Sequence, residues 1–466
     1  MKKAQKREAY PVLCLVFCCL HLILGLPSLA ALPKSTSRDE QKPGSPARKV
    51  KIVGPYLSRE DSDDLTRVVL KNSLTVIVFE RRDLPLVSIG TYVKTGYINE
   101  PDEESGISHV VEHMILNGTA KRSGGQIAQE TKRLGECLKA ETFYDHTYYS
   151  AVFPPENFRL GLEIQADALQ NPALPEPELK REIQVILEEA KQKLDDPIAF
   201  SSEKLNGLAF EVSPLRRWRM GDASTLLSLT RQQVFDFYKR WYIPSNIVLA
   251  VAGNMDRRLV LEEVTKRYGS MPPGQSLEST LPLEPEQRKL KYQELRGDIS
   301  QSVVKIGFGA PGAFTKAWYA CKVLEAVLAL GRSAILNREL KEGKSVISSV
   351  SSSSLDLMEQ GYLSFTLSVD SKMLNRAETL AFAELEKIRA GSLGDEDMER
   401  AKRLLEREFY LAQENLNDLA LQLAHSEHLA RYSEWRDYTK KIKSFRPLVN
   451  IWLYPGVACW STNPRL

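Results

Sequence analysis

The stretch GISHVVEHMILNGT, residues 106–119, places two histidines and a glutamate within five positions of a chain that has six histidines. Apolar residues recur through it at the spacing of a helix: Ile107, Val110, Val111 and Met114. On such a helix His109 and His113 lie one turn apart on the same face, with Glu112 beside them. Two neutral imidazoles so placed can hold Zn²⁺, and a neighbouring carboxylate that is not a ligand can take a proton from bound water. The alternative is a solvent-exposed helix face on which two histidines fall together by chance.

A catalytic zinc site needs a third protein ligand and an open fourth position, so the histidine pair predicts a distant partner. The best candidate segment is KREIQVILEEAKQKLDDP, residues 180–197. Glu182 and Glu189 are two helical turns apart in it and share a face with Val185 and Ile186. A carboxylate beside an apolar stripe is more often at the edge of a buried face than a metal ligand, so the spacing alone does not choose Glu189.

The rest of the chain predicts an α+β protein with two domains. At 466 residues it is too long for one ordinary core, and runs typical of strands and helices mix throughout. RVVLKNSLTVIVFER predicts a hairpin around a Lys-Asn-Ser turn, NIVLAVAG predicts a buried strand, and TRQQVFDFYKRWY, residues 230–242, predicts a helix with Thr230 as its N-cap. Residues 270–287 are rich in Pro, Ser and Glu and lack periodicity, which predicts a linker between a domain at 54–269 and another at 288–466. The 63 basic and 60 acidic residues give a formal charge of +3, which indicates neither nucleic-acid binding nor a polybasic membrane surface.

The first thirty residues predict an export signal. Residues 1–10 carry lysines and an arginine, residues 11–26 are apolar and uncharged, and Ser28–Ala30 fits a small-x-small cleavage site. We therefore expect residues 1–30 to be a signal peptide, followed by a flexible polar lead-in at 31–53. The mature protein is then expected to be periplasmic or secreted, without a membrane span. An uncleaved membrane anchor is the alternative.

These motifs and several others resemble the pitrilysin/insulinase family of zinc metallopeptidases, which includes the mitochondrial processing peptidase and many bacterial homologues. The order H-x-x-E-H is the inverzincin signature. The resemblance runs from about Val68 to Met255 and more loosely to about Tyr438. The matching pieces are LKNSLTVIVFE, GYINEPDEESGISHVVEHMILNGT, DHTYYSAVFPPENF, EIQVILEEAKQKLDDP and FYKRWYIPSNIVLAVAGNM.

The resemblance implies roles for the site residues and a fold. It makes Glu189 the third zinc ligand, Glu182 a carboxylate that supports the site, and Glu112 the catalytic general base, with one Zn²⁺ per chain. The implied architecture is two homologous α/β-sandwich domains of the metallopeptidase clam-shell type. Residues 445–466 do not resemble the closing helix and strand of the family, so the second domain is expected to be truncated or altered.

By the same resemblance, we expect a zinc-dependent endopeptidase that hydrolyses peptides or unfolded protein segments, with zinc-bound water activated by Glu112. Substrates in the family add a strand to a sheet edge near the zinc. One alternative is a non-catalytic assembly subunit of the same fold, although such relatives typically lose part of H-x-x-E-H, which is intact here. Another is a periplasmic zinc-binding protein, in which a base beside the metal would have no use.

Some positions depart from the family pattern. The family usually has Asn-Ala, after Gly-Gly, in its substrate-binding edge strand, whereas this chain has Glu136 at the second glycine and Lys139 at the asparagine. We expect Lys139 to be a solvated strand residue and the substrate specificity to be altered. His146 lies outside the metal motif and is expected to have a structural or supporting role. His425 and His428 are three positions apart on a predicted helix and are expected at the surface.

A partner subunit is also implied. In the family, the domain that faces the zinc carries an Arg and a Tyr that hold the substrate backbone, and the corresponding stretch here is residues 328–354. Ala334 occupies the arginine position and Ile347 or Ser348 the tyrosine position. This predicts a heterodimer with a homologous subunit that lacks H-x-x-E-H and carries the Arg/Tyr pair. A homodimer in which Arg338 serves as the arginine is the alternative.

Overall fold

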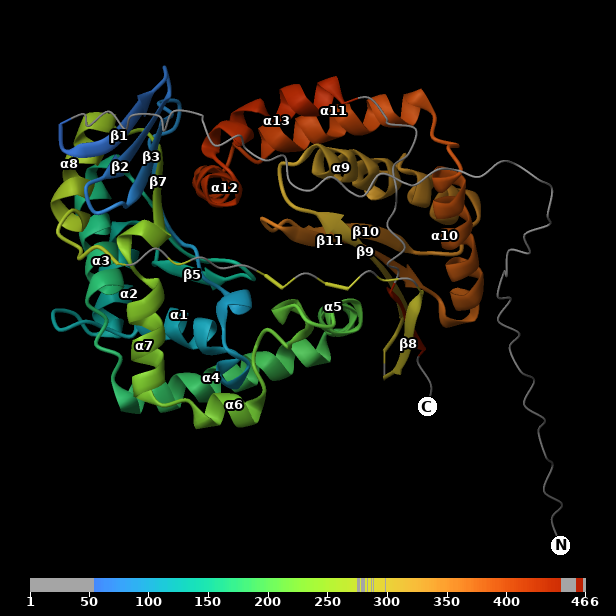
Figure 1. Ribbon diagram of the computed structural model, residues 1–466, viewed down its shortest axis with the longest axis horizontal. Coiled ribbons are helices and arrows are strands. Elements are labelled where there is room, and N and C mark those ends of the chain that lie inside the picture. Colours follow the sequence, from blue (N-terminus) through green and yellow to red (C-terminus); the bar gives the residue numbers. More distant parts are fainter. Residues whose placement is uncertain are drawn as a thin grey trace, which may run out of the picture. The chain divides into compact units, whose positions relative to one another are not determined.

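Strand β7 (Ile247–Gly253) lies at the centre of a seven-stranded sheet with the order β1-β2-β3-β7-β4-β6-β5 (Figure 1). The structure is a computed structural model that describes residues 54–445, apart from 275–276, 278–280, 283, 286, 288 and 298, together with the backbone of 458–463. β7 is parallel to β3, and the other neighbouring pairs are antiparallel. The other strands are β1 (Tyr56–Asp61), β2 (Leu65–Leu70), β3 (Thr75–Glu80), β4 (Val87–Val93), β5 (Lys139–Thr142) and β6 (Thr147–Phe153).

Two-residue periodicity places β7 at the centre of this sheet, because both of its faces are apolar. One face carries Ile247, Leu249 and Val251, and the other carries Val248, Ala250 and Ala252. The prediction of a buried strand at NIVLAVAG is confirmed. The predicted hairpin is confirmed as well, since β2 and β3 pair antiparallel around a turn in which Ser73 has φ of 74°.

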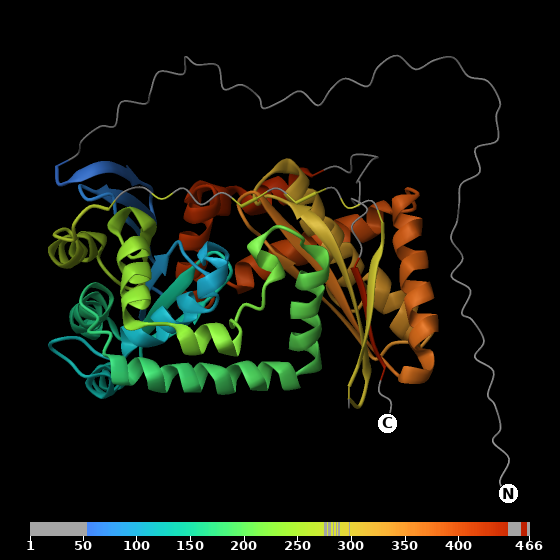
Figure 2. The ribbon, with the colours of Figure 1, turned by 60° about the horizontal axis from the view of Figure 1, so that its bottom comes forward.

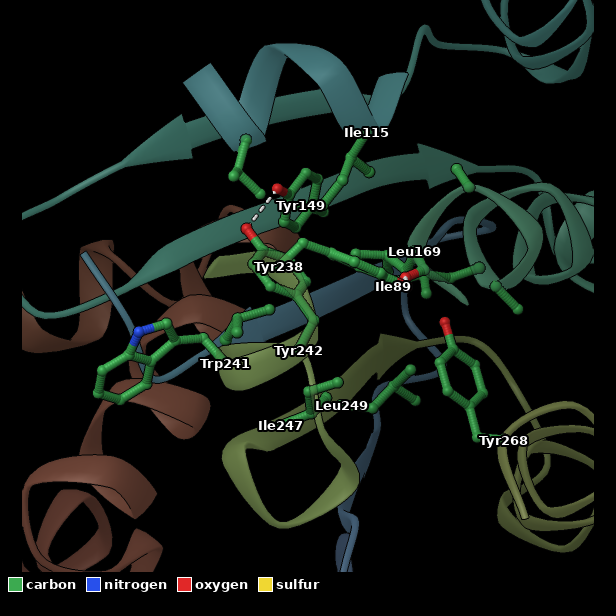
Figure 3. Packing of buried hydrophobic residues seen from close by; sticks show 14 of the residues in the cluster. Ile89, Ile115, Tyr149, Leu169, Tyr238, Trp241, Tyr242, Ile247, Leu249 and Tyr268 are labelled. Atoms are coloured by element: carbon green, nitrogen blue, oxygen red, sulfur yellow. Dashed lines mark hydrogen bonds between the residues drawn. The ribbon is translucent and has the colours of Figure 1, made fainter. Parts of the chain in front are cut away.

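A layer of helices covers the first of these faces and forms the larger core. Tyr149 of β6 and Tyr242 lie in this core, and their hydroxyls hydrogen bond at 2.8 Å (Figure 3). The predicted helix at 230–242 is confirmed as α7, and Thr230 caps it by accepting a hydrogen bond from the Gln233 amide. The helices of this part are α1 (Ile107–Leu116), α2 (Gly124–Leu134), α3 (Phe158–Gln170), α4 (Glu176–Asp195), α5 (Pro197–Ala209), α6 (Ala223–Ser228), α7 (Arg231–Trp241) and α8 (Arg257–Tyr268).

α4 is a long helix that ends where α5 begins (Figure 2). Pro197 cannot donate a hydrogen bond into the preceding turn, which stops α4. Asp196 then caps α5 by accepting from the Ile198 amide at 2.8 Å. α4 packs against α1 and against α5. Glu182 and Glu189 therefore lie along the helix that faces the histidine motif.

A helix from the far end of the chain, α12 (Leu416–Leu429), covers the second face of the same sheet. Leu419, Ala420, Leu423 and Ala424 pack against Val248 and its neighbours on β7 and against Tyr92 of β4. α12 therefore contacts the seven-stranded sheet although the linker separates the two in sequence. The predicted domain boundaries at 54–269 and 288–466 stay a prediction.

The second sheet has five strands in the order β10-β11-β9-β12-β8. β12 inserts between β9 and β8, antiparallel to β9 and parallel to β8. The C-terminal segment thus contributes a strand, although its sequence does not resemble a closing strand of the family. The strands are β8 (Lys291–Arg296), β9 (Ser302–Pro311), β10 (Ser349–Leu355), β11 (Gln360–Val369) and β12 (Ala458–Asn463), and the other helices are α9 (Lys316–Ala329), α10 (Leu374–Arg389), α11 (Asp395–Leu411) and α13 (Tyr432–Ser444).

The described part of the predicted linker is attached to the first half of the chain. Leu281 is buried with Phe210 and Leu215. The carboxylate of Glu284 accepts hydrogen bonds from the backbone amides of Glu211 to Ser213. The predicted signal peptide at 1–30 and the predicted lead-in at 31–53 lie outside the described residues.

Candidate metal centre

The helix that carries the histidine motif, α1, has an anchored N-terminus. Gly106 precedes it with φ of 96°, a conformation that favours glycine, and a Cβ there would lie 2.8 Å from the Met220 carbonyl oxygen. The buried carboxylate of Glu100 accepts hydrogen bonds from the amides of Gly106 at 2.8 Å and Ser108 at 2.9 Å. A carboxylate at this end also matches the positive end of the helix dipole. The apolar face of α1 is buried in the core, which fixes the direction of its opposite face.

His109 and His113 lie on that opposite face, one turn apart. Their Nε2 atoms are 3.2 Å apart. His109 is buried, and burial together with the nearby His113 lowers its pKa to about 3, so its imidazole is neutral at pH 7. Two neutral imidazole nitrogens that point at each other repel unless one carries a proton or a cation lies between them.

α4 supplies two carboxylates to this pair, and each meets a different side of it. Glu189 Oε2 lies 3.7 Å from His109 Nε2, on the side where the two Nε2 atoms converge. Glu182 Oε2 lies 3.0 Å from His113 Nδ1, on the opposite side of that ring. A hydrogen bond from Nδ1–H to Glu182 leaves the Nε2 lone pair of His113 free to bind a metal.

The three atoms fit a zinc ion. Ligands about 2.0–2.2 Å from a tetrahedral ion lie roughly 3.3–3.5 Å apart. His109 Nε2, His113 Nε2 and Glu189 Oε2 lie within 4.8 Å of one another, and the partly exposed carboxylate of Glu189 can move the remaining distance. Nδ1 of His109 is buried and has no hydrogen-bond partner among the described residues. The residues that the sequence predicted as ligands are therefore brought together.

Glu112 lies on the same helix but does not belong to this group of ligand atoms. Its side chain is buried, and burial raises the pKa of its carboxyl group. The Thr142 hydroxyl donates to Glu112 Oε2 at 2.6 Å, which fixes the carboxylate next to the histidines. Thr142 ends strand β5, so this bond links the motif to the edge of the sheet. Thr142 cannot be recognised as part of the site from the sequence, because nothing in the sequence shows which strand lies against α1.

β5 is the edge strand of the seven-stranded sheet, and its residues alternate between exposed and half-buried. Lys139 is exposed at its start, as expected, and forms an ion pair with Glu136. The other oxygen of Glu136 accepts a hydrogen bond from the Val152 amide at 3.0 Å. Glu136 and Lys139, the two residues that depart from the family pattern, therefore form an ion pair at the start of β5.

In the second half of the chain, the residues at the predicted Arg/Tyr positions cannot hold a peptide. Ala334 and Ile347 are buried apolar residues. Ser348 has neither an aromatic ring nor a charge, and its hydroxyl donates to the Ser368 carbonyl at 3.1 Å. Arg338, the alternative, binds Asp397 through two nitrogens at 2.9 and 3.2 Å.

One expectation about the histidines is wrong. His425 and His428 do not lie free at the surface, because Nδ1 of each hydrogen bonds to the buried hydroxyl of Tyr92 at 2.9 Å. The side of α12 that carries both histidines faces the seven-stranded sheet, so their rings lie next to Tyr92. His146 stacks on Tyr92 from the turn between β5 and β6 and is not among the ligand group of His109, His113 and Glu189. One feature of the sequence could have indicated this group. After the predicted signal peptide, every histidine lies either in H-x-x-E-H or at positions 146, 425 and 428.

Comparison with protein families matches two models along the chain. The model described as "Insulinase (Peptidase family M16)" matches residues 76–223, which include the whole candidate centre. The model described as "Peptidase M16 inactive domain" matches residues 228–405. No histidine occurs in that second range.

Similar proteins and structures agree with these matches. An uncharacterized zinc protease of Rickettsia felis is 29% identical over 352 residues, which cover 74% of this chain and 83% of the relative. The fold is similar to that of a protease from Helicobacter pylori, with a TM-score of 0.79, 22% identity, and coverage of 86% of this chain and 99% of the other. It is also similar to the periplasmic protease PqqL of Escherichia coli, with a TM-score of 0.72 and 20% identity; this match covers 86% of this chain and 48% of PqqL.

Proposed function

Since the chain belongs to the insulinase family of peptidases, M16, we propose that it is a zinc-dependent endopeptidase that hydrolyses peptides or unfolded protein segments. The observation that carries this proposal is the convergence of His109, His113 and Glu189 beside a buried Glu112 that is not part of the ligand group. A zinc-binding protein without activity would not need that fourth residue, whereas hydrolysis needs a base next to the metal.

In this proposal His109, His113 and Glu189 hold one Zn²⁺, and Glu182 keeps His113 in the tautomer that binds. The ion, when bound, supplies a Lewis acid that polarises the scissile carbonyl and acidifies water. Glu112 accepts a proton from the attacking water at its carboxylate and passes it to the leaving amine. Thr142 holds the Glu112 carboxylate by one oxygen, which leaves the other oxygen for the proton.

The substrate is proposed to bind along β5 as an added strand. The Phe143 amide donates to the His146 carbonyl at 2.7 Å, which starts the ladder between β5 and β6. Because facing groups alternate along an antiparallel ladder, the backbone groups of Ala140 and Thr142 are directed to the open edge. A peptide paired with them would pass next to Glu112, since Thr142 contacts both.

A second, related subunit is proposed to complete the site. The positions that would clamp the substrate backbone hold Ala334 and Ile347, and Arg338 is held by Asp397. The match to about half of PqqL supports this pairing, since in that protein a second half of similar size belongs to the same chain. We therefore propose a heterodimer with a homologue that lacks H-x-x-E-H and carries an Arg/Tyr pair.

The proposed location is the periplasm or the exterior of the cell. This rests on the signal-like composition of residues 1–30. In the part of the chain that the structure describes, no helix is long and apolar enough to cross a membrane.

The test is zinc analysis together with hydrolysis of internally quenched peptides, on the purified chain with and without its homologous partner. We expect zinc-dependent cleavage that is removed by a chelator and restored by Zn²⁺. If the chain bound zinc through the histidine pair but cleaved no peptide in either preparation, the proposal would fail in favour of the zinc-binding alternative. If the chain also bound no zinc, the result would support the alternative that it is a non-catalytic assembly subunit.

A further inference from the structure

Three histidines outside the candidate centre gather around one tyrosine. Tyr92 of β4 binds His425 Nδ1 and His428 Nδ1 of α12, each at 2.9 Å. The ring of His146 stacks on the Tyr92 ring with centroids 4.3 Å apart and lies 5.1 Å from the ring of His425. A hydroxyl has one proton, so Tyr92 can donate to only one of the two α12 rings and must accept from the other.

Asp145 and His146 leave two buried polar atoms without partners. Asp145 Oδ1 lies 2.7 Å from His146 Nδ1, but Asp145 Oδ2 and His146 Nε2 have no hydrogen bond within the described residues. The contact of Asp145 Oδ2 with His428 Nδ1, at 3.6 Å, is too long for a hydrogen bond. The two residues are only 6% and 5% exposed. Buried carboxylate and imidazole atoms are normally satisfied by hydrogen bonds, water or a metal, so both atoms point to a missing ligand.

The donor set suits a divalent transition-metal ion. One ligand atom from each of Asp145, His146 and His425 lies within 4.8 Å of the other two. Each imidazole offers a nitrogen lone pair, and Asp145 offers a carboxylate oxygen. Two imidazoles and a carboxylate are common ligands of Zn²⁺ and unusual ligands of Mg²⁺ or Ca²⁺.

A small cavity lies next to Asp145, one member of this group. It has a volume of about 40 Å³ and is lined by Asp145, His428 and Lys94, with Leu281 from the linker and Leu357 from the β10–β11 turn. A water molecule needs roughly 10–15 Å³, so the cavity can hold water beside the Asp145 carboxylate.

We propose that Asp145, His146 and His425 bind a second Zn²⁺ or a similar divalent transition-metal ion, separate from the candidate centre at His109 and His113. Tyr92 orients His425 through its Nδ1. The ion would join α12 to the turn between β5 and β6. That turn follows Thr142, so the second ion would fix the end of β5, the strand whose Thr142 donates a hydrogen bond to Glu112. This inference goes beyond the proposed peptidase function and does not depend on it.

The test uses the full chain with His109→Gln and His113→Gln, which removes the first site. Metal content after dialysis against Zn²⁺ is expected to be about two ions per wild-type chain and about one per double variant. Adding His425→Gln should remove that remaining ion. Adding His428→Gln is the matched control, because His428 lies on the same helix and binds the same tyrosine but is outside the ligand group. Although its Nδ1 also lies 3.6 Å from Asp145 Oδ2, this variant should retain the ion.

Unfolding must not be mistaken for ligand loss, so a second variant gives a positive signal. With Co²⁺ as the probe, His425→Cys in the double-variant background should show a near-ultraviolet thiolate-to-cobalt absorption, which forms only if residue 425 is a ligand. Thermal unfolding of the double variant should shift to lower temperature on adding a chelator. A double variant that is folded by circular dichroism yet holds no Zn²⁺ or Co²⁺ would overturn the proposal and leave a metal-free hydrogen-bond network. A folded, cobalt-loaded His425→Cys chain without the thiolate band would also overturn it.

Discussion

Two glutamates on α4 contact the histidine pair, and the sides they contact assign them different roles. Glu189 reaches the side where both Nε2 atoms converge, whereas Glu182 reaches Nδ1 of His113. A ligand contributes directly to metal binding, while a carboxylate behind a ligating histidine acts through ring orientation and basicity.

We predict that Glu182→Gln weakens zinc binding by about 10–100-fold and that Glu189→Gln weakens it by more than about 100-fold. Competition with a chromogenic chelator measures both affinities. Glu188 provides the matched control, because it neighbours Glu189 in sequence but is not among the residues grouped with the histidines. Equal affinities for Glu189→Gln and wild type would remove Glu189 from the ligands and redirect attention to Glu182.

We predict that Glu112→Gln keeps its zinc and loses about 10²–10⁴-fold in kcat, since a general base contributes on that order. Gln preserves the acceptor oxygen for Thr142 but cannot take a proton. Zinc analysis and peptide hydrolysis on the same sample check both halves of this statement. Normal turnover by the zinc-loaded variant would show that another group moves the proton.

Among the elements, β5 is the strand on which we propose that the substrate binds. It has a partner on one side, β6, and Thr142 connects its end to Glu112 on α1. Edge strands tolerate proline where the lost N–H faces away from the sheet. Such a substitution therefore separates substrate pairing from folding.

We predict that Ala140→Pro raises KM for peptides by about 10-fold, the effect of one lost backbone hydrogen bond, and leaves zinc content unchanged. The control is Lys139→Ala, which removes an exposed side chain but no backbone donor. Steady-state kinetics with a series of peptides distinguishes the two. A KM for Ala140→Pro equal to that of the control would argue against strand addition at β5.

In the molecule as a whole, the described residues form a candidate metal centre, whereas the positions of the family's peptide clamp lack the Arg/Tyr pair, as expected. Arg332 and Arg338 each form ion pairs with acidic residues of their own half, Glu342 and Asp397. The range matched by the inactive-domain model, 228–405, contains these positions.

We predict that the isolated chain is less active than the complex with its homologous subunit by on the order of 100-fold, because an unclamped substrate is poorly positioned. Arg338→Ala should leave the activity of the complex unchanged. Size-exclusion chromatography with light scattering, followed by peptide hydrolysis, measures both. Full activity of the chain alone that is lost in Arg338→Ala would instead support a homodimer.

Features that depend on local periodicity could be predicted from the sequence alone. A helix repeat places His109, Glu112 and His113 on one face, and a repeat of two makes 247–253 a strand buried on both sides. Local capping chemistry likewise predicted the start of α7 at Thr230. The family resemblance then chose Glu189 over its neighbours, and the structure places it beside the histidines.

Contacts between elements that are distant in sequence became clear only from the tertiary structure. Periodicity shows that a second face of β7 is apolar but not that α12, from beyond the linker, covers it. For that reason His425 and His428 were expected in solvent, whereas α12 packing brings them to Tyr92 and His146. Thr142 was overlooked for the same reason, since its bond to Glu112 joins an edge strand to a helix. The physical reason is that backbone geometry repeats over a few residues, while contacts between remote segments follow from how whole apolar faces pack.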